Sequence, residues 1–168
     1  EMLNIASIFK PHAACIVPEQ RQEITTEGGL DVVGQTDRLR EICDERTNIG
    51  SRVSLFIEAD EAQITAAAEL RVPVIEIHAG AYSDANPEDR PAELEKIKTG
   101  IKIATNIGLE CHVGHGLNYQ NVSKIAEVGE VAEVNIGHFL IAEAIFSGLG
   151  NSIKKMRELI DNARVQQE

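Results

Sequence analysis

Short apolar segments typical of β-strands alternate with amphipathic helical segments along most of this chain, and this alternation restricts the possible folds more than any other feature. The strand-like segments are rich in branched residues and bounded by Gly or Pro, as strands usually are. They span residues 13–17, 52–57, 74–78, 109–113 and 133–136. Helical periodicity follows in residues 37–46, 61–70, 92–107, 122–126, 139–146 and 152–164. Five β-α units in series predict an α/β protein with a parallel sheet and crossover helices.

Two architectures fit this pattern: an open, doubly wound sheet and part of a (β/α)8 TIM barrel. No Gly-rich nucleotide-binding loop follows the first strand, which counts against the first architecture. Polar residues instead follow nearly every strand, where barrel enzymes keep their catalytic residues. These polar residues are Glu19, Glu58, Asp60, Glu76, His78, His115 and His138. The sequence therefore favours the barrel.

The chain is short for a complete barrel. It has 168 residues, whereas a whole barrel needs roughly 250, which leaves it ~80 residues and about three strands short. Residues 2–9 are also helical in pattern, so the chain opens in the middle of a βα unit. We therefore expect residues 1–168 to be a single domain that forms the C-terminal portion of a barrel, strands four to eight, with the N-terminal units missing.

Charge and cysteine content exclude several classes of partner. Lys plus Arg is 16 and Asp plus Glu is 27, a net charge of −11, and nucleic-acid binding needs the opposite balance. No apolar run reaches the ~18–20 residues of a membrane span, and the first residues lack the features of a signal peptide. The three cysteines, at positions 15, 43 and 111, show no CxxC spacing. We expect reduced thiols and a cytoplasmic protein without nucleic-acid or membrane partners.

Residues 74–78 place two chemically active side chains on one face of a strand. Period-2 alternation separates Glu76 and His78 from Ile75 and Ile77, and the branched pair suits the surrounding helices. Glu76 and His78 should then point into the barrel. A buried carboxylate is costly unless it is paired or used. Glu76 is therefore either a structural residue satisfied by a neighbouring His or Lys, or a substrate-facing carboxylate with a pKa tuned by burial.

The last two strands end in segments that suit a phosphate site. His115 lies between two glycines, which let the backbone approach a ligand closely, and imidazole exchanges protons near neutral pH. Gly137 and His138 end the next strand, and the helix that follows offers free N–H groups to an anion. In barrels, the loops after strands seven and eight often bind phosphate. A turn with a solvated His remains the alternative for residues 114–116.

Residues 25–30 combine twin hydroxyls, a carboxylate and paired glycines in the loop after the first strand. Such a loop suits contact with a substrate, although a plain turn fits equally well.

Collinear motifs over almost the whole chain resemble the pyridoxine 5′-phosphate synthase family, specifically the C-terminal two-thirds of its chain. The motifs are residues 10–12, 17–19, 25–32, 54–57 with 59–60, 75–82, 114–117 and 135–138. The resemblance implies a (β/α)8 barrel and a cytoplasmic, cofactor-free and metal-free enzyme of vitamin B6 biosynthesis. The family condenses 3-amino-2-oxopropyl phosphate with 1-deoxy-D-xylulose 5-phosphate to give pyridoxine 5′-phosphate, phosphate and water. Its members form homo-oligomers, usually octamers.

The resemblance also implies roles for individual residues. His115 matches the proton donor of the family, and Glu76 matches the carboxylate that stabilises charged intermediates. The remaining matches are to substrate ligands: Thr25 for deoxyxylulose phosphate, and Gly116, Gly137 and His138 for the amino-ketone phosphate. Further family residues on the first three strands have no counterpart here.

Two other functions fit the residues. A barrel acting on another sugar phosphate, an epimerase or aldolase, could hold a divalent metal between Glu76, His78 and His115, since carboxylate and imidazole suit such ions. Alternatively, the chain could be a non-catalytic module that only binds phosphate or serves in assembly.

Overall fold

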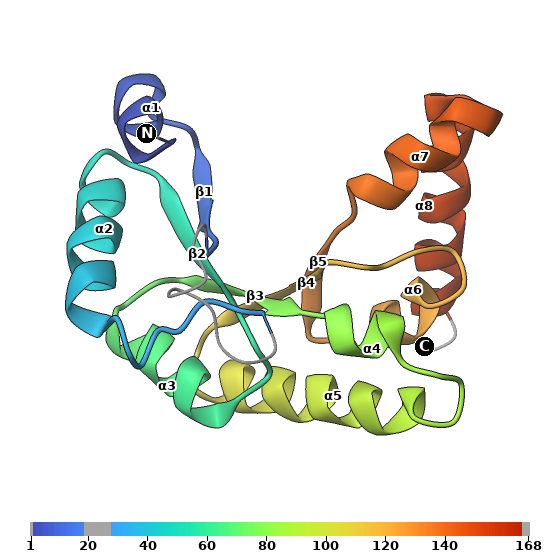
Figure 1. Cartoon of the computed structure of the whole chain (residues 1–168), viewed down its shortest axis with the longest axis horizontal. Coiled ribbons are helices and arrows are strands. Elements are labelled where there is room, and N and C mark those ends of the chain that lie inside the picture. Colours follow the sequence, from blue (N-terminus) through green and yellow to red (C-terminus); the bar gives the residue numbers. More distant parts are fainter. Residues whose placement is uncertain (1, 19–27, 166–168) are drawn as a thin grey trace.

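A curved parallel sheet with helices around its outer face forms the centre of the molecule (Figure 1). The computed structural model describes residues 2–18 and 28–165. The described elements are α1 (Met2–Phe9), β1 (Ala13–Ile16), α2 (Thr36–Asn48), β2 (Arg52–Ile57), α3 (Glu61–Glu69), β3 (Val74–His78), α4 (Gly80–Asp84), α5 (Arg90–Asn106), β4 (Glu110–Gly114), α6 (Val122–Ala126), β5 (Val131–Asn135), α7 (His138–Ser147) and α8 (Leu149–Val165). All five predicted strands are present within three residues of their expected bounds.

The strands pair in the order β1-β2-β3-β4-β5, and every pair is parallel. A doubly wound sheet reverses its strand order and carries helices on both faces. This sheet has no reversal, and α2, α3, α5 and α8 lie around its outside (Figure 1). The alternative of an open, doubly wound sheet is therefore wrong for the described residues. The additional expectation of three missing N-terminal strands is not supported by the structure and stays a prediction.

Strand alternation divides the sheet into an apolar outer face and a more polar inner face. In β2, Val53, Leu55 and Ile57 are fully buried in the core beneath the helices. In β3, Ile75 and Ile77 join the same core, which confirms that Glu76 and His78 lie on the opposite, inner face. A parallel strand covered by helices on one side needs this alternating pattern, because only its outer face is fully withdrawn from water.

A charged cluster lies on the inner face toward the amino-terminal ends of the strands. Arg52 of β2 forms an ion pair of 2.6 Å with Glu110 of β4, and His112 lies 2.8 Å from the same carboxylate. The hydrogen bond from Arg52 lowers the pKa of Glu110, which therefore stays ionised beside its partners. The inner face is thus lined by polar groups that satisfy one another, as burial beside a sheet requires.

A local sequence signal accounts for the start of α3. Asp60 caps this helix, because its carboxylate accepts a 3.0 Å hydrogen bond from the N–H of Gln63. The helix α4 was not expected, since its sequence GAYSD is too short to show a period. The strand β5 begins at residue 131 rather than 133, and a register shift opposite Cys111 and His112 accompanies that difference.

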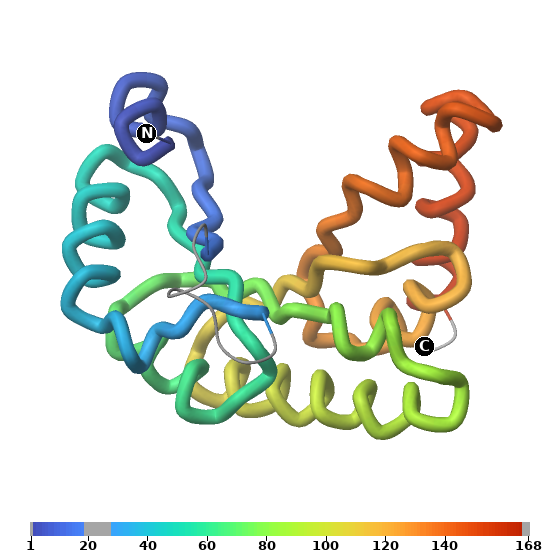
Figure 2. Tube along the Cα trace, viewed as in Figure 1, coloured from blue at the N-terminus to red at the C-terminus, as the bar shows by residue number. Residues whose placement is uncertain are grey.

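The N-terminal helix α1 is attached to α2 by a buried arginine. Arg46 is 1% exposed, and its guanidinium donates to the carbonyl oxygen of Leu3 and to Ser7 Oγ, both at 2.6 Å. Figure 2 shows α1 beside the ends of α2 and β1, with α7 and α8 at the opposite end of the molecule. Among the described residues, no helix combines the length and the apolar character that crossing a membrane requires.

Candidate active site

A cavity of about 1170 Å³ opens at the carboxyl ends of the strands, on the inner side of the curved sheet. It brings together five of the six residues that the sequence analysis assigned to a site: Glu76, His115, Gly116, Gly137 and His138. The two imidazoles of the last two strands therefore share one hollow, as the phosphate-site hypothesis required. The sixth residue, Thr25, lies outside the described residues.

Glu76 is held at the wall of this cavity by neighbours on both sides. Its Oε2 accepts a 2.8 Å hydrogen bond from Asn135 Nδ2 of β5 and a 3.6 Å hydrogen bond from the Cys15 thiol of β1. Burial raises the pKa of the Glu76 carboxyl above its ordinary value, and the two hydrogen bonds oppose that shift. The side chain is thus an oriented, partly desolvated carboxyl group at the cavity, and its partners are an amide and a thiol rather than a His or Lys.

The turn after β4 holds His115 in an uncommon backbone conformation. His115 has φ of 72° and Gly116 has φ of 77°, so two successive residues are left-handed. A non-glycine residue in this region carries local strain, which is often found at functional sites. The turn projects the His115 side chain to the rim of the cavity, where it is exposed.

The glycines beside His115 lie close to other parts of the protein, and Gly116 also lines the cavity. A Cβ on Gly114 would lie 2.0 Å from Glu76 Oε1, and a Cβ on Gly116 would lie 2.5 Å from Ser83 Cβ. Gly114 therefore leaves room for the Glu76 carboxylate, and Gly116 lets the turn lie against α4. The sequence could not reveal this, because both contacts join residues that are distant along the chain.

The start of α7 offers unpaired backbone N–H groups to the same cavity. Gly137 precedes the helix without a side-chain cap, and Gly137, His138 and Phe139 all line the cavity. The first turn of a helix has N–H groups without intrahelical partners and a positive dipole end. A Cβ on Gly137 would meet nothing within 4 Å, so the space beside it is open to a ligand.

Aromatic contacts position this helix start. Phe139 packs edge-to-face on Tyr119, with ring centroids 4.7 Å apart. The hydroxyl of Tyr119 donates a 3.0 Å hydrogen bond to the carbonyl of Ser152 on α8, and Lys155 lies over the Tyr119 ring. The α7 N-terminus is thus connected to α8 through Tyr119, which fixes its direction toward the cavity.

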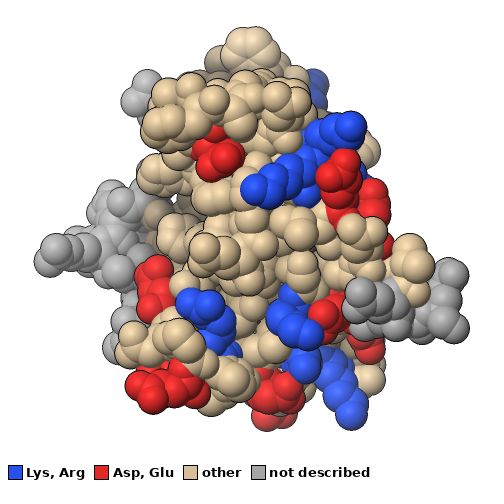
Figure 3. Space-filling model, turned by 90° about the vertical axis from the view of Figure 1, so that its right-hand side faces the viewer, with Lys and Arg blue, Asp and Glu red and all other residues tan. Residues whose placement is uncertain are grey.

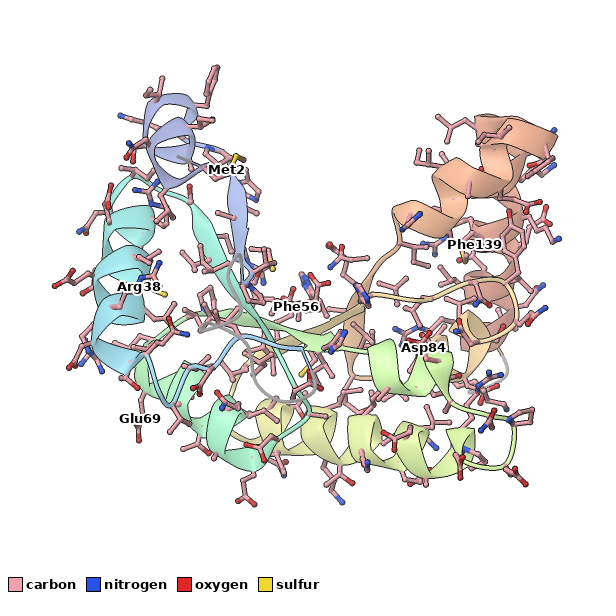
Figure 4. All side chains as sticks on the ribbon, in the orientation of Figure 1. Met2, Arg38, Phe56, Glu69, Asp84 and Phe139 are labelled. Atoms are coloured by element: carbon pink, nitrogen blue, oxygen red, sulfur yellow. The ribbon has the colours of Figure 1, made fainter. Side chains whose placement is uncertain are left out.

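Several cavity residues were not singled out by sequence reasoning. Phe56 of β2 lies inside the curve of the sheet (Figure 4), with its ring centroid 4.9 Å from that of His78 and 6.3 Å from that of His115. Asn135 orients Glu76, and Asn118 also lines the cavity. Phe56 and Asn135 lie within the motifs 54–57 and 135–138, but nothing in the sequence distinguished them from the other residues of those motifs.

The described residues contain no group of three His, Cys, Asp or Glu side chains arranged for a metal ion. His78 instead directs its Nδ1 to Glu58, at 2.7 Å. The proposed ligand set of Glu76, His78 and His115 is therefore not formed among the residues that the structure describes.

These features define a class: an α/β protein whose parallel sheet carries a helix start, an imidazole and a partly desolvated carboxyl group around one cavity. Within that class, the chain belongs to the family described as pyridoxal phosphate biosynthesis protein PdxJ, which matches residues 1–162. The family resemblance of the sequence motifs is thereby confirmed.

Curated relatives agree with this assignment. The chain is 55% identical over 166 residues to pyridoxine 5′-phosphate synthase of Zymomonas mobilis, covering 99% of this chain and 65% of the relative. It is 52% identical to the protein of that name from Caulobacter sp. strain K31, covering 99% and 68%, and 50% identical to that from Colwellia psychrerythraea, covering 98% and 67%. The chain thus spans about two thirds of the length of the curated relatives it matches.

Proposed function

We propose that this chain acts in pyridoxine 5′-phosphate synthesis, condensing 3-amino-2-oxopropyl phosphate with 1-deoxy-D-xylulose 5-phosphate to give pyridoxine 5′-phosphate, phosphate and water. The observation that carries the proposal is the convergence of Glu76, His115, Gly137 and His138 on one cavity. The names of the relatives supply the product, pyridoxine 5′-phosphate, and the resemblance of the sequence motifs implies the two substrates. The cavity supplies groups suited to phosphate binding and proton transfer.

The segments that follow β4 and β5 would recognise the phosphate group. The free N–H groups at the start of α7 and the exposed His138 would bind the phosphate of the amino ketone, with Gly116 beside them. The cavity, at about 1170 Å³, is somewhat larger than the ~300–1000 Å³ that is typical of small-molecule sites. It offers room for two small phosphorylated substrates, and Thr25 would contact the deoxyxylulose phosphate.

Proton transfer falls to His115 and Glu76. The amine attacks the ketone, water and phosphate then leave, and the ring closes, so each stage moves protons. His115 stands exposed at the rim and would donate a proton to the departing oxygen. Glu76, held by Asn135, would offset positive charge that develops on nitrogen.

Replacement of His115 by Asn tests the reaction. We expect turnover in the native polypeptide to fall by about 10²–10⁴-fold, because the proton donor is lost while a side chain of similar size remains. Circular dichroism should show an unchanged fold, and the exposed Gln120→Asn serves as a control in the segment that follows the same turn. Full turnover by the His115 variant would refute the role. Absence of turnover by the unmodified chain, with phosphate still bound, would favour the non-catalytic module.

The finer features of the resemblance belong to the same proposal. We propose that the curved sheet is part of a (β/α)8 barrel, in keeping with its sequential strand order, and that the protein is a cytoplasmic homo-oligomer without cofactor. Exposed apolar residues at the junction of α7 and α8, Ile145 and Phe146 among them, support self-association. From the side of α7 and α8, residues other than Lys, Arg, Asp and Glu cover much of the upper part of the surface, with charged residues of both signs within this area and below it (Figure 3). Sedimentation velocity tests the oligomer.

A further inference from the structure

A buried carboxylate lies behind the proposed proton donor and contacts two separate segments of the chain. Glu58 directly follows β2 and is 8% exposed. Its Oε1 accepts a 2.8 Å hydrogen bond from the N–H of Gly29, and His78 Nδ1 lies 2.7 Å from the same oxygen. The reaction proposed above gives no role to Glu58 or to His78.

The contact between Glu58 and Gly29 is close and specific. A Cβ on Gly29 would lie 2.7 Å from the backbone nitrogen of Glu58, so the chain at this point lies directly on the end of β2. The next residue, Leu30, donates a 2.8 Å backbone hydrogen bond to Phe56. Glu58 therefore occupies a fixed position, and it presents an acceptor oxygen to His78 with little freedom to turn away.

This geometry selects one tautomer of His78. A carboxylate can only accept hydrogen bonds, so the proton of a neutral imidazole must reside on Nδ1, which leaves Nε2 without a hydrogen. The Nε2 side of the ring faces Gly80, because a Cβ added to Gly80 would lie 2.5 Å from that nitrogen. The same Cβ point is 3.4 Å from Cδ2 of His115, so the unprotonated edge of His78 lies toward the His115 ring.

His115 depends on this neighbour for its orientation. The centroids of the two imidazole rings are 4.9 Å apart, and the ring planes meet at 62°. Phe56 is the other ring beside His115, at 6.3 Å. The backbone of His115 is left-handed and exposed, and the Ser83 hydroxyl lies 3.5 Å from its carbonyl oxygen. The contacts with the rings of His78 and Phe56 therefore restrain the orientation of the His115 imidazole.

We propose that Glu58 and His78 are a positioning pair, which holds His78 as its Nδ1–H tautomer and thereby sets the orientation of the His115 ring at the cavity. The inference rests on the proposed function for the role of His115. The tautomer itself does not, since it follows from the contacts of Glu58. Positioning by a partner hydrogen-bonded to an imidazole is a general way of fixing both the tautomer and the direction of the ring.

The first experiment measures the tautomer in the unmodified chain. Nitrogen-15 NMR of the ring atoms, assigned with His78→Gln, should show His78 at neutral pH with a protonated Nδ1 and an unprotonated Nε2. A cross-peak between protons of the two rings should place His115 beside His78. A protonated Nε2 with an unprotonated Nδ1 would overturn the proposal, whether or not the chain turns over substrate.

The second experiment removes the shared acceptor while keeping a side chain of similar size. Glu58→Leu lacks the oxygen that accepts from Gly29 and lies against His78 Nδ1, so nothing from residue 58 then selects the Nδ1–H tautomer. We expect kcat to fall by about 10²-fold with KM changed by less than about threefold, since the phosphate-binding groups remain. Glu61→Leu, which replaces an exposed carboxylate at the start of α3, is the matched control.

Two outcomes of this comparison contradict the proposal. Unchanged kcat together with altered His78 ring signals would show that the pair does not act through His115. A parallel loss of kcat and phosphate affinity, with no change in the His78 ring signals, would assign Glu58 a purely structural role. Failure of the proposed reaction is recognised separately, because the unmodified chain would then show the expected tautomer without any turnover.

Discussion

The Glu76 side chain shows how burial and hydrogen bonding compete at a single residue. Desolvation favours the neutral acid, while the donors on Cys15 and Asn135 favour the carboxylate. Burial prevails, and the pKa is raised. Such a group can change its protonation during a reaction more readily than an ordinary surface carboxylate, which suits a residue facing charged intermediates.

We predict that Glu76→Gln changes the pH dependence of stability. The folded chain with a raised carboxyl pKa binds a proton more tightly than the unfolded chain does, so its stability is highest below the ordinary carboxyl pKa and falls as pH rises through the raised value. Glutamine removes this decline. The free energy of unfolding of the variant should therefore rise relative to that of the unmodified chain as pH increases above about 4, the ordinary carboxyl pKa.

Urea unfolding followed by circular dichroism at several pH values measures this difference. Glu88→Gln, on an exposed loop before α5, controls for the loss of one carboxylate in general. A difference that stays constant or shrinks with rising pH would show that Glu76 is not destabilised in its charged form. Turnover should fall in the same variant, because glutamine cannot carry the negative charge proposed to act on the developing cation.

At the level of elements, the alternation of strands and helices predicted most of the fold. Each strand was visible because its outward residues are apolar and branched, as in β2 and β3. The helix α4 was missed, since five residues cover little more than one turn and show no period. The approach of Gly29 to Glu58 was equally invisible, because it joins residues 29 positions apart. Local patterns predict elements, whereas contacts between distant segments require the folded chain.

The start of α7 carries a prediction about phosphate. Gly137→Val should fold normally, because a Cβ at this position meets no protein atom within 4 Å and φ of −109° is accessible to valine. The branched side chain would fill the open space beside the helix N–H groups. We expect binding of inorganic phosphate to weaken by about tenfold or more.

Isothermal titration with phosphate measures this effect, and Gly150→Val offers a comparison at another glycine with open surroundings, within α8. Unchanged phosphate affinity in the Gly137 variant would remove this helix start from the site.

The attachment of α1 to α2 gives a second prediction at this scale. Arg46→Met keeps an unbranched apolar stem but removes the donors to Leu3 and Ser7. The carbonyl of Leu3 and the hydroxyl of Ser7 then lose a charged donor. This loss should lower the free energy of unfolding by about 1–3 kcal/mol. We expect hydrogen exchange of residues 5–9 to accelerate while β3 is unaffected, and equal protection of α1 in both proteins would contradict the role of Arg46. Arg38→Met, exposed near the start of α2 (Figure 4), is the control.

At the scale of the whole molecule, the sheet predicts a gradient of local stability. β3 pairs with β2 and β4, and its residues Ile75 and Ile77 are completely buried. β1 and β5 each pair with one strand among the described residues, and both carry exposed positions. Strands with a single neighbour open at lower free energy, because fewer hydrogen bonds and apolar contacts must break.

We therefore expect the backbone amides of β3 to exchange most slowly, those of β2 and β4 to follow, and those of β1 and β5 to exchange first. Hydrogen–deuterium exchange resolved by peptide, with the 168-residue chain, measures the order. The comparison is sharp because β3 and β5 have equal lengths of five residues but differ in pairing and burial. Protection of β1 and β5 equal to that of β3 would mean that both edges are covered in solution. In that case the cavity at the strand ends would be enclosed at both edges of the sheet. The predicted gradient instead makes β1 and β5 the parts of the cavity wall that open most readily.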